Sequence, residues 1–144
     1  MKDIGIDFTN KEEFLSTMHQ EGFFAYESGI TVTDINSEHS FGQLDITDKN
    51  LNLTRIVHGG ALVTLGDTVA GAYVFHNIGR AVTTSQNFYF LRPGLGKTIY
   101  CKGTPKKLGS RLCVMDVTLT GEDGKEVASG TFTFYVLPKL GSKE

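Results

Sequence analysis

Residues 52–67 read NLTRIVHGGALVTLGD, and this segment says more about the chain than any other. Two adjacent glycines, Gly59 and Gly60, follow His58 and open a long apolar run, which predicts a helix that begins at about Gly59. The first turn of a helix leaves backbone N–H groups without partners and carries a partial positive charge. Such a helix start therefore suits an oxygen atom that becomes negative during a reaction.

One carboxylate, Asp67, lies two turns inside the predicted helix. A carboxylate within an apolar helix is costly unless it has a partner or a chemical role. The helix start and Asp67 together indicate acyl-transfer chemistry, in which Asp67 acts as a general base or as a direct nucleophile. The competing interpretation is a buried carboxylate that braces a neighbouring backbone group.

The composition is that of one soluble globular domain. The chain has 144 residues, of which 40% are hydrophobic and 21% are charged, so it can bury a core of ordinary size. A formal net charge of -2 argues against a nucleic-acid partner. Six basic side chains and no acidic one occur from Arg92 to Arg111, which predicts either a local anion-binding edge or a solvated basic one.

The sequence predicts neither a membrane association nor a metal site. The longest apolar run, residues 61–75, is too short and too interrupted to cross a bilayer, and the N-terminus lacks the apolar centre of a signal peptide. We therefore expect a cytoplasmic protein. Cys101 and Cys113 lack the spacing of zinc ligands and are expected on neighbouring strands as free, half-buried thiols.

Hydrophobic periodicity predicts a single domain over residues 1–144 with two helices and six strands. A short N-terminal helix at about 10–20 is capped by Thr9 or Asn10, and a long helix at about 59–78 is apolar on nearly every face. The strands are expected at 30–33, 41–46, 81–91, 97–104, 111–120 and 125–137. This order favours an α+β fold in which a mostly antiparallel sheet wraps around one central helix, with its core at about 30–137 and a polar tail from Pro138 to Glu144.

This pattern resembles the hotdog fold, and specifically the PaaI-like thioesterases of the phenylacetic-acid-degradation type. The likeness covers residues 30–136 and rests on Asn52, on the His58-Gly59-Gly60 triplet, on Asp67 and on the strand at 82–93, VTTSQNFYFLRP. The motifs of hotdog hydratases and dehydratases are missing from the sequence. The resemblance implies an enzyme that hydrolyses aryl, medium-chain or long-chain acyl-CoA without a metal, and without a cofactor other than the coenzyme A of its substrate.

Four residues besides Asp67 are candidates for a role in catalysis. The Gly59 N–H is the candidate donor that polarises the thioester carbonyl, although a helix start also needs flexible residues for its own sake. Asn52 either adds an amide donor or simply makes a turn, and the family spacing favours the first. The resemblance implies that Thr83 orients the attacking water, with Thr84 and Ser85 as rivals. It also implies that His58 shapes the loop by hydrogen bonding and is not the base.

The thiol half of the substrate needs cations for its phosphates and room for close approach to the backbone. Guanidinium and ammonium groups supply the first, and glycine supplies the second. The residues expected to bind the substrate are Gly60, Arg92, Lys106, Lys107, Gly109, Ser110 and Arg111. Which of the basic side chains contacts a phosphate is left open by the sequence.

The spacing of Gly59 and Asp67 predicts a dimer. Eight residues along one helix correspond to about 12 Å, whereas a polarising donor and a base must both lie within roughly 3 Å of the reacting atoms. Two antiparallel copies related by a two-fold axis can bring Gly59 of one chain to Asp67 of the other. We therefore expect an obligate homodimer, and the resemblance implies a homotetramer built from two dimers. The alternative function is a hotdog module that binds acyl-CoA as a sensor, for which a carboxylate near the carbonyl would be of no use.

Overall fold

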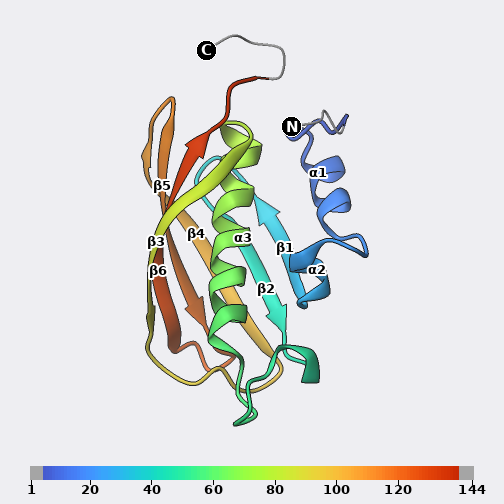
Figure 1. Cartoon of the computed structure of the whole chain (residues 1–144), viewed down its shortest axis with the longest axis vertical. Helices are drawn as coiled ribbons and strands as arrows, with labels where there is room; N and C mark the ends of the chain where they lie inside the picture. The colour runs from blue at the N-terminus through green and yellow to red at the C-terminus, as the bar shows by residue number, and fades with distance from the viewer. Residues whose placement is uncertain (1–4, 140–144) are drawn as a thin grey trace.

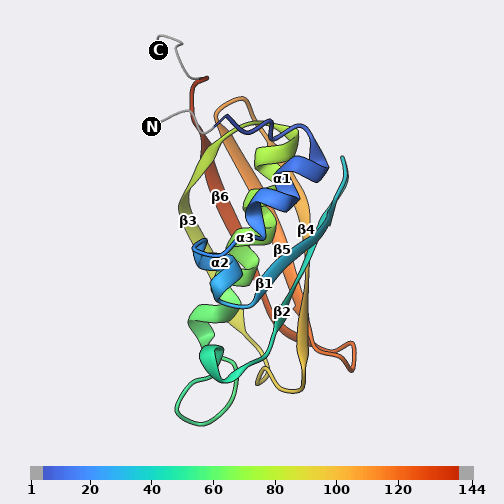
Figure 2. The same cartoon turned by 90° about the vertical axis from the view of Figure 1, so that its right-hand side faces the viewer.

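The computed structural model describes residues 5–139, and its elements follow the predicted order (Figure 1). The chain forms, in order, α1 (Lys11–Met18), α2 (Phe24–Glu27), β1 (Ile30–Ile35), β2 (Ser40–Asp45), η1 (Asp48–Asn50), α3 (Gly59–Asn77), β3 (Ala81–Phe90), β4 (Thr98–Leu108), β5 (Leu112–Thr120) and β6 (Glu126–Val136). All six strands form one antiparallel sheet in the order β1-β2-β4-β5-β6-β3. The sheet curves around α3, as Figures 1 and 2 show, which confirms the predicted α+β hotdog fold.

The central helix is buried because its sequence is apolar around its whole circumference. Glycines on two central strands let it lie close to the sheet, since a Cβ on Gly42 would lie only 2.5 Å from the Val69 side chain. The buried Ser40 hydroxyl also donates a hydrogen bond of 2.7 Å to the Val69 carbonyl. These contacts fix the middle of α3, two residues after Asp67, to the neighbouring strands.

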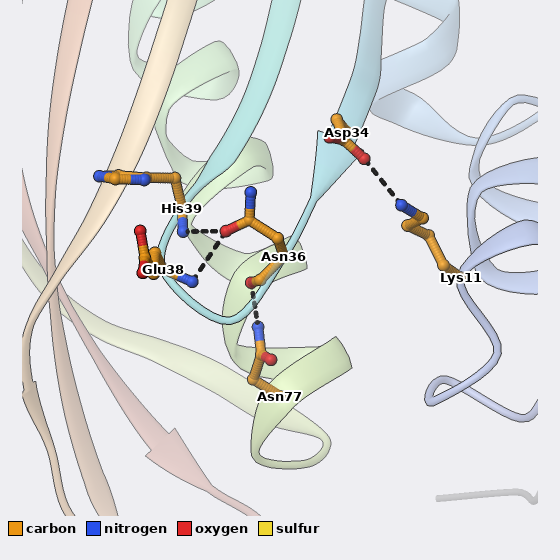
Figure 3. Close-up of polar contacts among 6 residues, drawn as sticks. All are labelled: Lys11, Asp34, Asn36, Glu38, His39 and Asn77. Carbon is orange, nitrogen blue, oxygen red and sulfur yellow. Dashed lines mark hydrogen bonds and ion pairs between the residues drawn. The ribbon is translucent and has the colours of Figure 1, made fainter.

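The termini of the packed elements are tied together by polar side chains (Figure 3). The side-chain oxygen of Asn36 accepts two backbone N–H groups of the β1–β2 turn, and Asn77 at the end of α3 donates to the Asn36 carbonyl at 3.0 Å. Lys11 of α1 forms an ion pair of 2.9 Å with Asp34 of β1. The N-terminal helix and the end of α3 are thereby held beside the first two strands.

The structure differs from the sequence-based expectation in the length of β4 and in two short elements, and it leaves the predicted tail untested. β4 continues four residues beyond the predicted end at Thr104, because Pro105 lies at a bulge near the strand end and does not terminate the strand. The elements α2 and η1 were not predicted, since four and three residues are too short to show a periodic pattern. The predicted polar tail lies mostly outside the described residues, which end at Lys139.

The two cysteines lie on the neighbouring strands β4 and β5 and are free, as predicted, but they are fully buried and not half-buried. Burial raises the pKa of the Cys101 thiol and, more weakly, that of Cys113, so neither is a reactive thiolate. Within residues 5–139 no cluster of His, Cys, Asp and Glu side chains is able to hold a metal ion. None of the helices in that range is both long and apolar enough to cross a bilayer.

Candidate active site

The carboxylate of Asp67 is held by one hydroxyl group. Thr83 of β3 donates a hydrogen bond of 2.6 Å to Oδ1 of Asp67 on α3. Burial raises the pKa of the half-buried Asp67, and the hydrogen bond from Thr83 lowers it in part. Neither of the two ion pairs found among the described residues involves Asp67. A carboxylate that is poorly solvated and lacks a cation accepts a proton more readily than one on an open surface.

A β-bulge determines which hydroxyl reaches Asp67. Thr83 is paired with Phe134 and Ser85 with Thr133, so Thr84 is an extra residue in β3. Side chains alternate between the two faces of a strand, and one extra residue shifts that alternation. The Thr84 hydroxyl donates instead to the Thr133 carbonyl at 3.1 Å. Of the three rivals, the structure places Thr83 against the carboxylate.

The start of α3 presents one free N–H group and one that is occupied. His58 is the N-cap residue, and its Nδ1 accepts a hydrogen bond of 2.8 Å from the Gly60 N–H. An Nδ1 that accepts carries no proton, so the neutral ring is protonated at Nε2. By contrast, the Gly59 N–H donates none of the hydrogen bonds found in residues 5–139. A Cβ on Gly59 would lie 3.3 Å from the ring of Phe90, so the space beside this amide is narrow.

Asn52 makes a turn and also offers a donor. Its Oδ1 accepts hydrogen bonds from the N–H of Thr54 at 2.9 Å, the hydroxyl of Thr54 at 2.8 Å and the N–H of Ile56 at 3.3 Å. With the oxygen engaged, the orientation of the amide is fixed. The Nδ2 group has no acceptor among the described residues, so it is available to a bound molecule.

The candidate residues are divided between two cavities. Asp67 and Thr83 line a cavity of about 400 Å³ together with apolar side chains from α1, α2 and β6. Asn52 and Gly59 line a different cavity of about 380 Å³, to which Phe90 and Arg92 also contribute. The structure thus brings Asn52 to Gly59 and Thr83 to Asp67. It does not bring the two pairs together within one chain.

The other predicted binding residues lie away from Gly59. Lys106 and Lys107 are at the end of β4, and residues 109–111 form the turn to β5, at the end of the molecule opposite the loop that precedes α3 (Figure 1). Gly109 is required by that turn, since its Cβ would lie 2.7 Å from the Leu112 carbonyl, to which the Gly109 N–H donates. Ser110 lines a third cavity near the end of α3. A role of these residues in binding coenzyme A stays a prediction.

Sequence reasoning missed the contribution of the N-terminal segment. Residues between Ile6 and Ala25 form much of the cavity beside Asp67, although they are far from it in sequence. A signal was present in the adjacent pair Phe23 and Phe24, because two aromatic side chains in a short polar segment need an apolar surface nearby. The aromatic residues of the central helix divide between core and cavity: Tyr73 is buried in the core, whereas Phe75 lines the cavity.

Comparison with known proteins identifies a family and several similar structures. The family model of the thioesterase superfamily matches residues 55–128, just over half of the chain. A Streptococcus mutans protein solved bound to acetyl CoA is 32% identical, with a TM-score of 0.72 over 76% of this chain and 90% of that one. A Streptococcus pneumoniae protein described as a hypothetical thioesterase and solved with coenzyme A is 27% identical, with a TM-score of 0.75 over 85% and 96% of the two chains.

Further structures extend this likeness. The Streptococcus pneumoniae protein has also been solved with alanine in place of an aspartate and in place of a threonine. The PaaI protein of Escherichia coli, from the phenylacetic acid degradation operon, shares the fold at 22% identity, with a TM-score of 0.80 over 92% of this chain and 97% of that one. The chain therefore belongs to the thioesterase superfamily, as an enzyme that hydrolyses thioesters and shares the hotdog fold of PaaI.

Proposed function

We propose that this enzyme hydrolyses acyl-CoA to the free acid and coenzyme A. The observation that carries the proposal is the hydrogen-bonded pair of Asp67 and Thr83, which opens on an apolar cavity. The similar proteins solved with acetyl CoA and with coenzyme A support the choice of thiol. In the Streptococcus pneumoniae protein the substituted aspartate and threonine are separated by the same sixteen positions as Asp67 and Thr83, which supports a joint role for this pair.

The chemistry follows from the two pairs of residues. The Gly59 N–H, assisted by the Asn52 amide, donates to the thioester oxygen and stabilises the negative charge that develops there. Thr83 occupies Oδ1 of Asp67, which leaves Oδ2 to take a proton from the attacking water. The water oxygen bonds to the carbonyl carbon, the carbon–sulfur bond breaks, and the departing thiolate takes up a proton. If Asp67 attacks directly, its carboxylate displaces the coenzyme A thiolate and forms a mixed anhydride, which water then hydrolyses. When that water attacks the carboxyl carbon of Asp67, a single turnover in ¹⁸O-labelled water leaves the label in Asp67 and not in the released acid.

A second copy of the chain completes the site in this proposal. Gly59 and Asp67 line separate cavities of one chain and are about 12 Å apart along α3. β3 is an edge strand of ten residues and carries exposed apolar side chains, among them Val82 and Tyr89. Edge strands of this length are usually covered or paired. Antiparallel pairing of two β3 strands about a two-fold axis would place Gly59 of one protomer near the partner's Asp67. A tetramer of two such dimers is the further expectation.

The proposal is tested by release of free thiol from a panel of aryl, short-chain, medium-chain and long-chain acyl-CoAs. We expect hydrolysis of at least one class, with kcat/KM in the range of about 10⁴ to 10⁸ M⁻¹s⁻¹ that is common for enzymes. Binding of acyl-CoA without any thiol release would contradict the proposal. That result would favour the alternative of a sensor module.

A further inference from the structure

We propose that the acyl group of the substrate occupies the cavity beside Asp67, and that the N-terminal segment of residues 6–25 determines which acyl groups are accepted. This inference rests on the proposed hydrolysis of acyl-CoA. It adds a specificity-determining element that precedes the residues matched by the family, 55–128.

This cavity, called the trough below, is lined by residues of α3, of β3 and of the N-terminal segment. Figure 1 shows β3 on one side of α3 and the pair α1 and α2 on the other, and in Figure 2 this pair faces the viewer. The lining includes Asp67 and Gly71 from α3, Ala81 and Thr83 from β3, and residues of the N-terminal segment between Ile6 and Ala25, which form the N-terminal wall. Six phenylalanine side chains line the trough: Phe8, Phe14, Phe23, Phe24, Phe75 and Phe134. Asp67 is the one ionisable side chain among its lining residues within the described part of the chain.

The two cavities differ in chemistry, and this difference indicates which half of the substrate binds in each. A trough lined by aromatic rings stabilises an apolar group, whereas it offers nothing to a phosphate or to an adenine amino group. The cavity at Gly59 contains the Arg92 side chain, whose guanidinium group suits the polar thiol half. Because the thioester carbonyl must lie at Asp67, the acyl group extends from there into the trough.

One part of the N-terminal wall packs against α3 and β1, whereas the part at the rim of the trough is exposed to solvent. Phe8, Phe14 and Phe75 pack together with ring centroids 5.3 to 6.1 Å apart. His19 accepts a hydrogen bond of 3.0 Å from the Val32 N–H and ties the end of α1 to β1. At the rim, by contrast, Phe23 and Phe24 are 47% and 74% exposed. A bound acyl group would cover these rings, and their burial would add to the affinity.

The size of the trough indicates an acyl group larger than acetyl. Its volume of about 400 Å³ falls in the range of small-molecule sites. Each methylene that enters it should tighten binding about fourfold, which corresponds to about 0.8 kcal/mol. The gain should stop at the chain length that fills the trough.

The experiment uses the full-length chain with Asp67→Asn, so that the acyl-CoA stays intact during calorimetry. Dissociation constants are measured for straight-chain acyl-CoAs from acetyl to palmitoyl and for phenylacetyl-CoA. Met18→Trp is added to fill the trough, and Phe24→Ala to remove a ring from its rim. Tyr26→Ala is the matched control, because it also removes a ring from α2 and Tyr26 does not line the trough.

We expect Met18→Trp to shorten the chain length at which the gain stops and to weaken binding of the longest acyl group at least about tenfold, with acetyl-CoA unchanged. Phe24→Ala should weaken the longer acyl groups more than Tyr26→Ala does. A profile without dependence on chain length, as expected if the partner's side chains fill the trough, would overturn the inference. The inference would also be overturned if Met18→Trp and Phe24→Ala each gave the same dissociation constants as the control, Tyr26→Ala.

Thiol release is measured in parallel for the unmodified enzyme and for Met18→Trp and Phe24→Ala made in the chain that retains Asp67, and it separates this inference from the proposed function. Hydrolysis with chain-length profiles that neither trough variant alters would overturn the inference alone. Chain-length-dependent binding that Met18→Trp abolishes, in an enzyme that releases no thiol, would support the inference and overturn the proposed hydrolysis.

Discussion

At the start of α3 the chemically useful group belongs to the backbone, whereas two turns further along it belongs to a side chain. The Gly59 N–H is free because His58 bonds to Gly60 and because no side chain at position 59 fills the space beside Phe90. Asp67 is useful because it is poorly solvated and is held by Thr83. Activity that depends on Gly59 should therefore be lost when the backbone N–H is removed and retained when the N–H is kept. Activity that depends on Asp67 should be lost when its side chain is replaced.

The largest expected effect is that of Asp67→Asn. Loss of a general base should lower kcat by at least about a hundredfold, measured by thiol release. Burial raises the pKa of Asp67 above its value in the unfolded chain. Ionisation of Asp67 therefore lowers the free energy of unfolding at neutral pH, and this loss disappears when the pH falls below the pKa of Asp67 in the unfolded chain. Asp67→Asn should therefore melt at or above the temperature of the unmodified enzyme at pH 7 to 8. Near-normal turnover in this variant would remove Asp67 from the reaction.

Replacing Gly59 by proline deletes one N–H and adds ring carbons beside Phe90. Proline is favoured at the first position of a helix, and His58 has φ -59° and ψ 135°, which the residue before a proline readily adopts. We expect Gly59→Pro to lower kcat by about 10² to 10³. Gly59→Ala is the matched control, since it adds the same Cβ near Phe90 and keeps the donor. Equal losses in the two variants would mean that the space matters and the N–H does not.

Thr83→Ala should have an intermediate effect that depends on pH. The Thr83 hydroxyl lowers the pKa of Asp67, so its removal should raise that pKa further and move the acidic limb of the kcat/KM profile to higher pH. We expect about a tenfold loss of activity near pH 7, in line with a hydrogen bond to a charged group. Thr83→Ser retains the hydroxyl and should retain the profile. An unshifted limb in Thr83→Ala would show that this hydroxyl does not tune the base.

The smallest expected effect concerns the basic side chains. Truncating Lys106 and Lys107 together should raise KM by up to about fivefold with little change in kcat, because exposed ionic contacts contribute little and act on binding. The rise in KM, relative to the unmodified enzyme, should become smaller as salt is added. Arg92→Ala provides the comparison, since Arg92 lines the same cavity as Gly59. A collapse of kcat with unchanged KM would contradict a binding role for the two lysines.

Local patterns in the sequence predict most of this fold. The all-round apolar character of residues 59–78 predicts a wrapped helix, and α3 ends one residue before that limit. Alternation and turn residues predict the six strands, because those signals arise from neighbours in sequence. β4 is longer than predicted, because a bulge at Pro105 accommodates the proline and the pairing with β5 continues beyond it.

The geometry of the site depends on contacts that local patterns do not contain. The choice of Thr83 over Thr84 requires the bulge in β3, and the free Nδ2 of Asn52 requires the turn that engages its oxygen. The trough wall requires residues 6–25 to pack beside α3, a contact between distant parts of the chain. Spacing along α3 nevertheless predicts that Gly59 and Asp67 cannot serve one carbonyl in one chain, because the rise of a helix is constant.

The most direct test of a site shared between two chains is complementation. A chain with Asp67→Asn and a chain with Gly59→Pro, each nearly inactive alone, are unfolded together and refolded as an equal mixture. A mixed dimer then contains one site with both groups intact, so thiol release should recover to about one quarter of the unmodified enzyme's. Activity no higher than the average of the two separate variants would contradict a site built from both partners.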